Sequence, residues 1–122
     1  MTEHKPILIL DFDGVIHSYT SGWKGAEVIP DPPVEGAFVA IEKYATFFDV
    51  CVLSSRSHQG GGIEAMKAWM EYHCPGSTKW VRFPLEKPPA LVSIDDRAIQ
   101  FNGTWPDPDR LLSFKPWNAQ TV

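Results

Sequence analysis

Three short hydrophobic runs, each ending at polar residues, punctuate the chain. Residues 7–10 are continuously apolar and stop at Asp11, residues 50–53 form a second run, and residues 91–94 form a third that stops at Asp95. Short unbroken runs of this kind are typical of strands buried on both faces of a parallel sheet. They predict the central strands of the fold.

Two segments between these runs have apolar residues at helical spacing. Residues 34–48 carry one apolar stripe, which predicts a helix with Asp31 as its N-cap. The second helix is predicted to follow Gly60-Gly61-Gly62, a run that lacks the Lys-Ser/Thr ending of a P-loop and therefore favours a flexible link over a phosphate cradle. The core-facing side of this helix is predicted to carry Ile63, Met66, Trp69, Met70 and His73.

The remaining segments have weaker patterns. Residues 79–83 are predicted to form a strand, and the apolar residues between 99 and 114 predict one or two more, with a turn at Asn102-Gly103. Residues 15–30 are rich in glycine and polar residues, which predicts a loop or small hairpin.

Strands that alternate with helices predict right-handed crossovers and a parallel sheet covered by helices. At 122 residues, the chain is expected to form a single domain, 1–122. In such α/β folds, sites form at the carboxyl ends of the strands. The polar residues expected at that edge are Asp11 with Asp13, Ser54 with Ser55, and Asp95 with Asp96.

Composition narrows the class of protein. Hydrophobic residues make up 43% and charged residues 21% of the chain, which is typical of a globular protein rather than a disordered one. The net charge of −4 gives no overall basic field to attract nucleic acid or anionic lipid. Cys51 is expected to be a buried free thiol, and the first apolar run is too short for a signal-peptide core or membrane span. A soluble cytoplasmic protein without a membrane partner is expected.

The expected cluster of four acids needs a counter-charge. Two unit charges about 4 Å apart repel by about 4 kcal/mol at an effective dielectric near 20. A divalent cation would relieve this repulsion, and oxygen ligands with few histidines nearby favour Mg²⁺ over zinc. The cluster therefore predicts a magnesium site.

The same residues suit phosphoryl transfer. A carboxylate such as Asp11 can attack phosphorus and form an aspartyl-phosphate, while a second acid such as Asp13 handles protons. Ser54 offers a hydroxyl donor to a phosphoryl oxygen, and Lys87 offers a positive charge.

The ordered motifs resemble those of the haloacid dehalogenase superfamily. Asp11-Phe12-Asp13-Gly14-Val15 is similar to its first motif, the run ending at Ser54 to its second, Lys87 to its third, and Ile94-Asp95-Asp96 to its fourth. The resemblance spans roughly residues 6–101. Neither gap between motifs has room for a cap domain, so it points to a capless member with an open site.

This resemblance implies a three-layer α/β/α Rossmann-like fold with a mostly parallel sheet and a flap over residues 15–30. It implies Asp11 as the nucleophile and Asp13 as the acid/base. Ser54 and Lys87 would hold the phosphoryl group, with Ser55 and Arg56 as further candidates. Mg²⁺ would bind Asp11, the Asp13 backbone carbonyl, Asp95 and Asp96, the last directly or through water. Because Asp13 is present, the expected reaction is hydrolysis of a phosphate monoester, such as a nucleotide, a nucleic-acid end or another exposed phosphate.

Each candidate residue also has a simpler interpretation. Asp11 and Asp13 could be solvated turn acids, and Asp95 and Asp96 a helix N-cap pair. Ser54 could simply cap the next turn, with Ser55 as the rival hydroxyl. Arg56 and Lys79 are rivals of Lys87, and Arg56 could form an ion pair. The predicted flap residues His17, Trp23 and Lys24 either contact substrate or pack the loop.

Two other functions stay open. A non-catalytic protein with the same fold could bind magnesium or phosphate without turnover. A phosphoacceptor receiver domain also uses clustered acids, a lysine and magnesium, but its lysine comes last, whereas Lys87 precedes the Asp95-Asp96 pair. The substrate and the oligomeric state do not follow from the sequence. The tail, with Trp105 and Trp117, either supports association or packs back on the domain.

Overall fold

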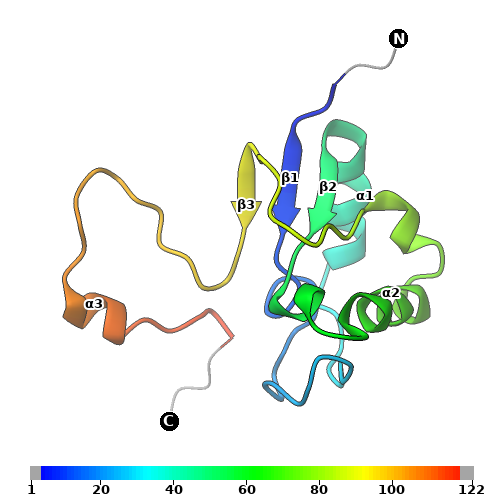
Figure 1. Ribbon diagram of the computed structural model, residues 1–122, viewed down its shortest axis with the longest axis horizontal. Helices are drawn as coiled ribbons and strands as arrows, with labels where there is room; N and C mark the ends of the chain where they lie inside the picture. Colours follow the sequence, from blue (N-terminus) through cyan, green and yellow to red (C-terminus); the bar gives the residue numbers. More distant parts are fainter. Residues whose placement is uncertain (1–3, 119–122) are drawn as a thin grey trace.

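Three short parallel strands organise the protein (Figure 1), whose computed structural model describes residues 4–118. The strands are β1 (Ile7–Leu10), β2 (Asp49–Val52) and β3 (Val92–Ile94), in the order β2-β1-β3. All pairs are parallel; Leu10 lies opposite Val52 on one side and Ile94 on the other. The three predicted strands are thus confirmed, with their ends shifted by at most one residue. Only β1 is central, however, and all residues of β3 are exposed, so the prediction of a strand buried on both faces is wrong for β3.

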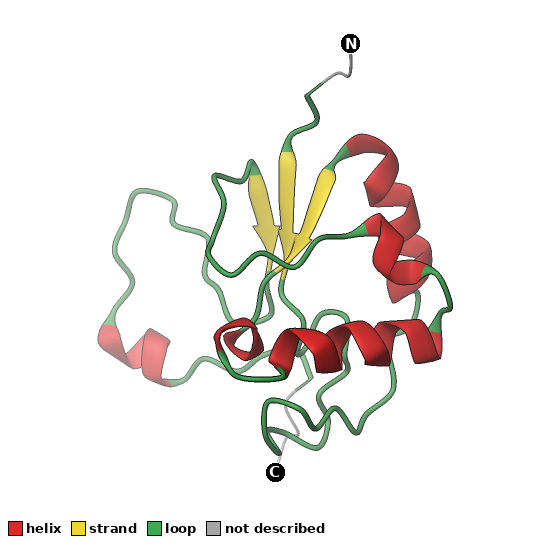
Figure 2. Ribbon diagram, turned by 45° about the vertical axis from the view of Figure 1, so that its right-hand side comes forward, coloured by secondary structure: helices red, strands yellow, loops and turns green. Residues whose placement is uncertain are grey.

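Helices α1 (Ala37–Phe47) and α2 (Gly62–His73) lie on the side of β2 (Figure 1). The other elements besides strands are the 3₁₀ turn η1 (Ser55–His58), the 3₁₀ turn η2 (Ser77–Trp80) and α3 (Pro108–Leu112). Figure 2 shows α2 lying crosswise near the arrowheads of the strands. The core joins β1 and β2 to Ile41 of α1 and to Met66 and Met70 of α2. The fold is therefore α/β, with a small open parallel sheet.

Trp69 of α2 ties the helix to the loop that follows β1. Its ring meets Phe12 edge-on, with centroids 5.2 Å apart, and lies 5.5 Å from the ring of His17. Its Nε1 donates to the carbonyl of Asp31 at 3.3 Å. One buried side chain thus packs against both ends of the predicted flap segment, which fixes that segment on the domain.

The flap itself is a closed loop rather than a regular hairpin. Ser18 donates its backbone N–H to Pro32, and Val34 donates to Ile16, so the two ends of the segment run antiparallel for a few residues. Asp31 does not cap α1 as predicted. The N-cap is Gly36, whose φ of 82° places it in the left-handed region, and the Asp31 carboxylate instead accepts hydrogen bonds from Ser21. A local bond that closes the loop has replaced the predicted helix cap.

Two weaker predictions are wrong. Residues 77–80 form η2 instead of a strand, and only Arg82 makes a single bridge to Cys51 of β2. Residues 99–114 contain no strand in the described structure, and their regular element is the short helix α3. Arg82 bonds to Val50 and Val52 of β2, but the preceding residues are wound into η2, so no ladder forms there.

The chain after β3 forms an arm with exposed apolar side chains. Figure 1 shows it leaving the sheet on the side of β3, away from α1 and α2, with α3 at its far end. Phe101 and Trp105 pack on each other with ring centroids 4.8 Å apart, although both are exposed. Among residues 4–118, no helix is both long enough and apolar enough to cross a membrane.

The glycine run before α2 is tightly packed rather than a free link. A Cβ on Gly62 would overlap the carbonyl oxygen of Arg56, whereas one on Gly60 would meet nothing within 4 Å. Gly61 has a φ of 80°, and a Cβ there would overlap Glu27 of the flap. These contacts hold η1, α2 and the flap together.

We predict that Gly62→Ala lowers the free energy of unfolding by about 1–3 kcal/mol, because the new methyl group must displace the Arg56 backbone. Urea unfolding of both variants measures this. Gly60→Ala is the matched control and should change the midpoint little or raise it slightly, because it removes only unfolded-chain freedom. Equal effects of the two substitutions would contradict the packing described here.

Candidate functional site

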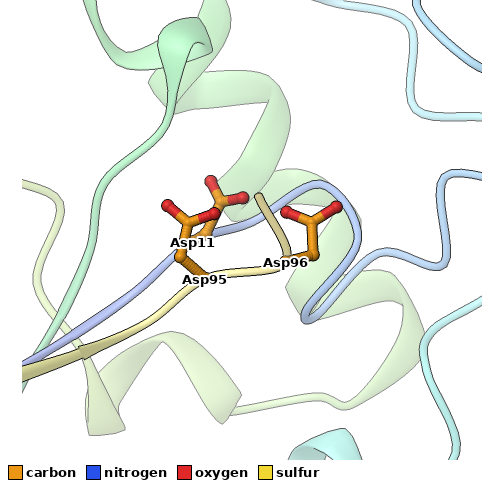
Figure 3. Close-up of side chains that lie close together, drawn as sticks. All are labelled: Asp11, Asp95 and Asp96. Atoms are coloured by element: carbon orange, nitrogen blue, oxygen red, sulfur yellow. The ribbon is translucent and has the colours of Figure 1, made fainter. Parts of the chain in front are cut away.

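Three carboxylates meet where β1 and β3 end (Figure 3). Asp11 directly follows β1, and its backbone N–H donates to the carbonyl of Ile94 at 3.0 Å, which extends the ladder by one step. Asp95 and Asp96 directly follow β3. One carboxylate oxygen from each of the three residues lies within 4.8 Å of the others, a spacing that a single cation can bridge. The parallel register thus brings together residues 84 positions apart in sequence.

Electrostatics hold a proton on this cluster. Burial raises the pKa of Asp11 from 3.8 to about 8, together with the close approach of the Asp96 carboxyl and the negative charges of Asp95 and Asp96. At neutral pH the metal-free cluster therefore retains a proton on Asp11. The same repulsion favours a cation that replaces this proton.

Asp96 is the clearest sign of a missing partner. Its side chain is 1% exposed, and neither carboxylate oxygen has a hydrogen-bond donor among residues 4–118. The Arg97 Nε lies 3.9 Å away, beyond hydrogen-bond distance. A buried carboxylate without a donor is costly, so a proton shared with Asp11 or a bound cation is the charge that fits there.

Gly14 allows this close approach. A Cβ at Gly14 would overlap the Asp96 carboxylate, and the backbone φ of 86° is one that other residues rarely adopt. The loop after β1 can therefore pass directly beside the acids of β3 only with glycine at this position.

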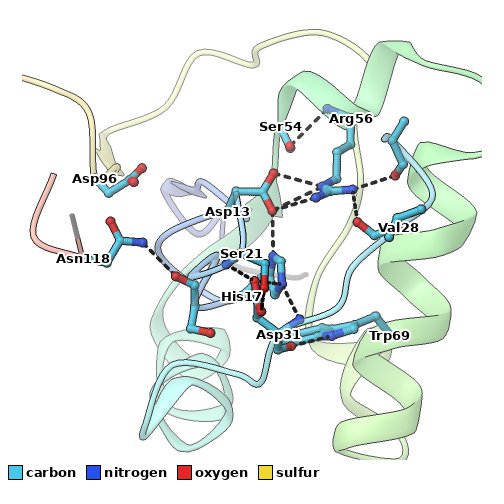
Figure 4. Close-up of polar contacts among 12 residues, drawn as sticks. Asp13, His17, Ser21, Val28, Asp31, Ser54, Arg56, Trp69, Asp96 and Asn118 are labelled. Carbon is cyan, nitrogen blue, oxygen red and sulfur yellow. Dashed lines mark hydrogen bonds and ion pairs between the residues drawn. The ribbon is translucent and has the colours of Figure 1, made fainter. Parts of the chain in front are cut away.

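Asp13 does not join the other three acids. Its carboxylate turns toward η1 and the flap (Figure 4), where it accepts hydrogen bonds from Arg56 Nε at 2.9 Å and Arg56 Nη2 at 3.1 Å. His17 Nδ1 lies 2.9 Å from the same carboxylate. Burial opposes ionisation of Asp13, but the bonds from His17 and Arg56 outweigh it and hold the pKa of Asp13 below its usual range. The expected four-acid cluster is therefore a three-acid cluster beside an ionised, paired Asp13.

Arg56 is a buried clamp in this structure. Its side chain is 0% exposed, and besides Asp13 it donates from Nη1 to the carbonyls of Gly25, Ala26 and Val28. Its guanidinium also lies 4.8 Å from the centre of the Trp23 ring. The predicted phosphate contact of Arg56 has no support in this placement, because most of its donors already bind the protein.

His17 continues the same network behind Asp13. The backbone N–H of Asp31 donates to His17 Nε2 at 3.1 Å, so Nε2 is the acceptor and Nδ1 carries the proton that Asp13 accepts. His17 is fully buried. Of the two interpretations of this residue, the structure supports loop packing rather than a substrate contact.

Ser54 ends β2 as a buried cap. Its Oγ accepts the backbone N–H of Arg56 at 3.1 Å, and its own N–H donates to Ser57 Oγ at 3.1 Å. The simpler interpretation of Ser54 as a cap is observed, yet its hydroxyl proton remains available to a phosphoryl oxygen. Ser55 is exposed in η1, and its predicted role in phosphate binding stays a prediction.

Lys87 makes no polar contact with the acids in this structure. It is exposed in the segment that connects Arg82 to β3, and no hydrogen bond or ion pair links it to Asp11, Asp95 or Asp96. Its predicted role at the phosphoryl group stays a prediction. Lys24 of the flap likewise has no polar contact to the cluster among residues 4–118.

Sequence reasoning did not find the role of Arg56, His17 and Asp31 in holding Asp13. The spacing of His17 four positions after Asp13 was a faint signal, but the loop between them is not helical. Arg56 was predicted to be a candidate phosphate ligand or a member of an ion pair, without a named partner. Its partner could not be read from sequence, because Asp13 is 43 residues away.

Comparison with known proteins gives no relative for this chain. No protein-family model matches the sequence, and no curated protein or solved structure matches it significantly. The candidate site therefore rests on its own geometry and on the motifs in the sequence.

We predict that metal-free protein loses stability through Asp11 as pH rises from about 4 to 8. Below pH 3.8 Asp11 is protonated in both the folded and unfolded states; above it the unfolded chain ionises while the folded site keeps its proton until about pH 8. The unfolded state then binds fewer protons, so the free energy of unfolding falls, by at most about 1.4 kcal/mol per pH unit for one group. In EDTA, Asp11→Asn should therefore gain stability relative to wild type across this range.

Asp49→Asn serves as the control for these urea titrations. Its bonds from Arg82 lower the pKa of Asp49, so its stabilising contribution is present above its unfolded pKa and is lost as pH falls. The difference between Asp11→Asn and wild type should therefore change between about pH 4 and 8. The difference for Asp49→Asn should stay constant there and change, with the opposite sign, only below pH 3.8. A pH-independent difference for Asp11→Asn would show that Asp11 ionises normally in the fold.

Proposed function

We propose that this protein is a capless, magnesium-dependent phosphohydrolase of the haloacid dehalogenase type, with Asp11 as nucleophile. The observation that carries the proposal is the cluster of Asp11, Asp95 and Asp96, in which Asp96 is buried without a donor. The order of the sequence motifs supports it, as does the parallel sheet that places the first and fourth motifs side by side. On this proposal the fold is a small version of the three-layer Rossmann-like arrangement.

The three acids fit a hard divalent cation. They offer carboxylate oxygens from the ends of two strands, and Asp95 is exposed. This exposure leaves room for the water molecules that Mg²⁺ tends to keep and for substrate oxygens. Asp11, Asp95, Asp96 and the backbone carbonyl of Asp13 would hold the ion. Bound there, it would neutralise the acids and the charge that spreads over the phosphoryl oxygens.

In the proposed reaction an oxygen of ionised Asp11 attacks phosphorus, the bond to the ester oxygen breaks, and the leaving alkoxide takes up a proton from water. Water then cleaves the aspartyl-phosphate to release inorganic phosphate and regenerate Asp11. Ser54 would donate its hydroxyl proton to a phosphoryl oxygen. Lys87 would have to approach from its exposed segment when substrate binds.

Asp13 fits one half of its proposed acid/base role better than the other. Paired with Arg56 and His17, it is ionised and can accept the proton of the attacking water in the second step. Protonating the leaving oxygen requires Asp13 to hold a proton, which the Arg56 pair opposes. The proposal therefore favours esters whose leaving alcohol needs little help from an acid.

A second candidate function is binding of magnesium and a phosphate group without turnover. The pairing of Asp13 with buried Arg56 favours it, because that pairing withholds the acid from the three-acid cluster. The two functions differ in whether any phosphate ester is hydrolysed.

The test is release of phosphate from an aryl phosphate, whose leaving group needs little protonation, by wild type and variants with Mg²⁺ or EDTA. We expect wild-type activity that requires Mg²⁺. Asp11→Asn should lower kcat by at least about a hundredfold, because the amide cannot form the acyl phosphate. Asp95→Asn should weaken Mg²⁺ binding and therefore raise the Mg²⁺ concentration for half activity.

Asp49→Asn is the matched control, since Asp49 opens β2 at the opposite end of the strand and pairs with Arg82 on the surface. Its activity should equal that of wild type. Full activity of Asp11→Asn would contradict the assigned nucleophile. Magnesium binding with no hydrolysis of aryl phosphates, nucleotides or phosphorylated oligonucleotides would instead support the binding protein.

A further inference from the structure

The end of the described chain returns to the loop that follows β1. After β3 the mostly exposed arm runs through α3, and then Trp117 Nε1 donates to the carbonyl of Gly14 at 2.7 Å. Asn118 Nδ2 donates to the carbonyl of Ser18, also at 2.7 Å. Figure 4 shows Asn118 on the same side of this loop as Asp96. Two side-chain bonds thus dock the tail beside the candidate site.

Trp117 is held next to the acids yet stays open to solvent. Its bonding partner, Gly14, is the residue against which the Asp96 carboxylate packs, so a single residue separates the indole from the cluster. The side chain is nevertheless 65% exposed. A large flat ring that is fixed by its N–H and otherwise uncovered is a surface on which another planar group can stack.

The other exposed tryptophans are placed differently. Trp23 lies over the guanidinium of Arg56, with the ring centre 4.8 Å away, so that ring already has a partner. Trp105 is 83% exposed, but it packs on Phe101 in the arm and has no bond to the loop after β1. Among the tryptophans of the described chain, Trp117 alone combines an open ring with a bond to the candidate site.

We propose that Trp117 is a stacking platform for the nucleobase of a nucleotide substrate, an assignment that rests on the proposed phosphohydrolase function. An aromatic ring joined directly to the phosphate would lie over the acids themselves. In a nucleotide the ribose separates phosphate from base, which lets the base extend past Gly14 to the ring of Trp117. Stacking of a base on an exposed aromatic side chain tolerates any base, so Trp117 selects for nucleotides as a class.

Two ligands that differ only in the base test this directly: adenosine 5′-monophosphate and ribose 5-phosphate. Their affinities are measured by titration calorimetry with Mg²⁺ on the Asp11→Asn protein, which cannot turn them over. Adding Trp117→Ala should weaken binding of the nucleotide about tenfold and change ribose 5-phosphate binding less than twofold. Trp105→Ala, the matched exposed tryptophan, should change neither. Unchanged melting temperatures confirm that both variants are folded.

An equal loss for both ligands, or no loss for either, overturns the platform, since Trp117 would then only anchor the tail or do nothing at the site. Phosphotyrosine is a third ligand; if it binds as tightly as the nucleotide and loses as much in Trp117→Ala, the nucleobase assignment is wrong. Turnover by the wild-type chain separates this inference from the proposed function. Hydrolysis without preference for the base overturns the platform alone, and base-dependent binding without hydrolysis of any ester overturns only the phosphohydrolase.

Discussion

Mutual repulsion among Asp11, Asp95 and Asp96 is the constraint that organises this end of the molecule. The parallel ladder extends from Leu10 to Asp11 against Ile94, so strand pairing forces the acids together whether or not a counter-charge is present. A proton retained on Asp11, whose pKa rises to about 8, reduces the repulsion among the three carboxylates. A site that stores repulsion in this way is prepared for a cation, because binding relieves a penalty already present in the fold.

A second network keeps the loop after β1 in the shape that the acids need. Arg56 bridges Asp13 to the carbonyls of the flap, His17 bonds to Asp13 from the other side, and Trp69 packs against the ring of His17. Because Arg56 and His17 are fully buried, the charge of Arg56 and the hydrogen bonds of both side chains are satisfied inside the domain rather than by solvent. The loop thus gains a rigid inner face toward Arg56, and its outer face, with Gly14, lies against Asp96 and Trp117.

The sequence predicted the parts of the fold that depend on short-range pattern. The runs at 7–10 and 50–53 became the buried strands β1 and β2, because continuous apolar stretches can be buried between neighbours. The run at 91–94, which contains Ser93, became the exposed strand β3, and the parallel pairing brought the polar ends of β1 and β3 to one edge. The same logic placed Asp11 beside Asp95 and Asp96. It failed for residues 79–83 and 99–114, where apolar content alone predicted strands. The 3₁₀ turn η2 takes up residues 77–80, so that only Arg82 pairs with β2, and residues 99–114 pair with no strand of the described structure.

Long-range side-chain choices were beyond such reasoning. Asp13 could turn toward Asp11 or toward Arg56 with the same backbone pattern, and the outcome depends on a charge 43 residues away. The docking of Trp117 on Gly14 spans 103 residues and had no local signal beyond an aromatic residue in the tail. The glycine run 60–62 was predicted to be flexible because the sequence shows only that these residues lack side chains. It does not show that the Arg56 carbonyl leaves no room for a side chain at Gly62.

Titration calorimetry of the metal-free protein with Mg²⁺ at pH 7, in two buffers of different ionisation enthalpy, tests the central claim most directly. Because Asp11 holds a proton at this pH, a cation at the cluster must displace it. The account predicts one binding site and release of about one proton per ion, seen as a difference in apparent enthalpy between the buffers. Absence of binding at millimolar Mg²⁺, or binding with no proton released, would contradict the three-acid site.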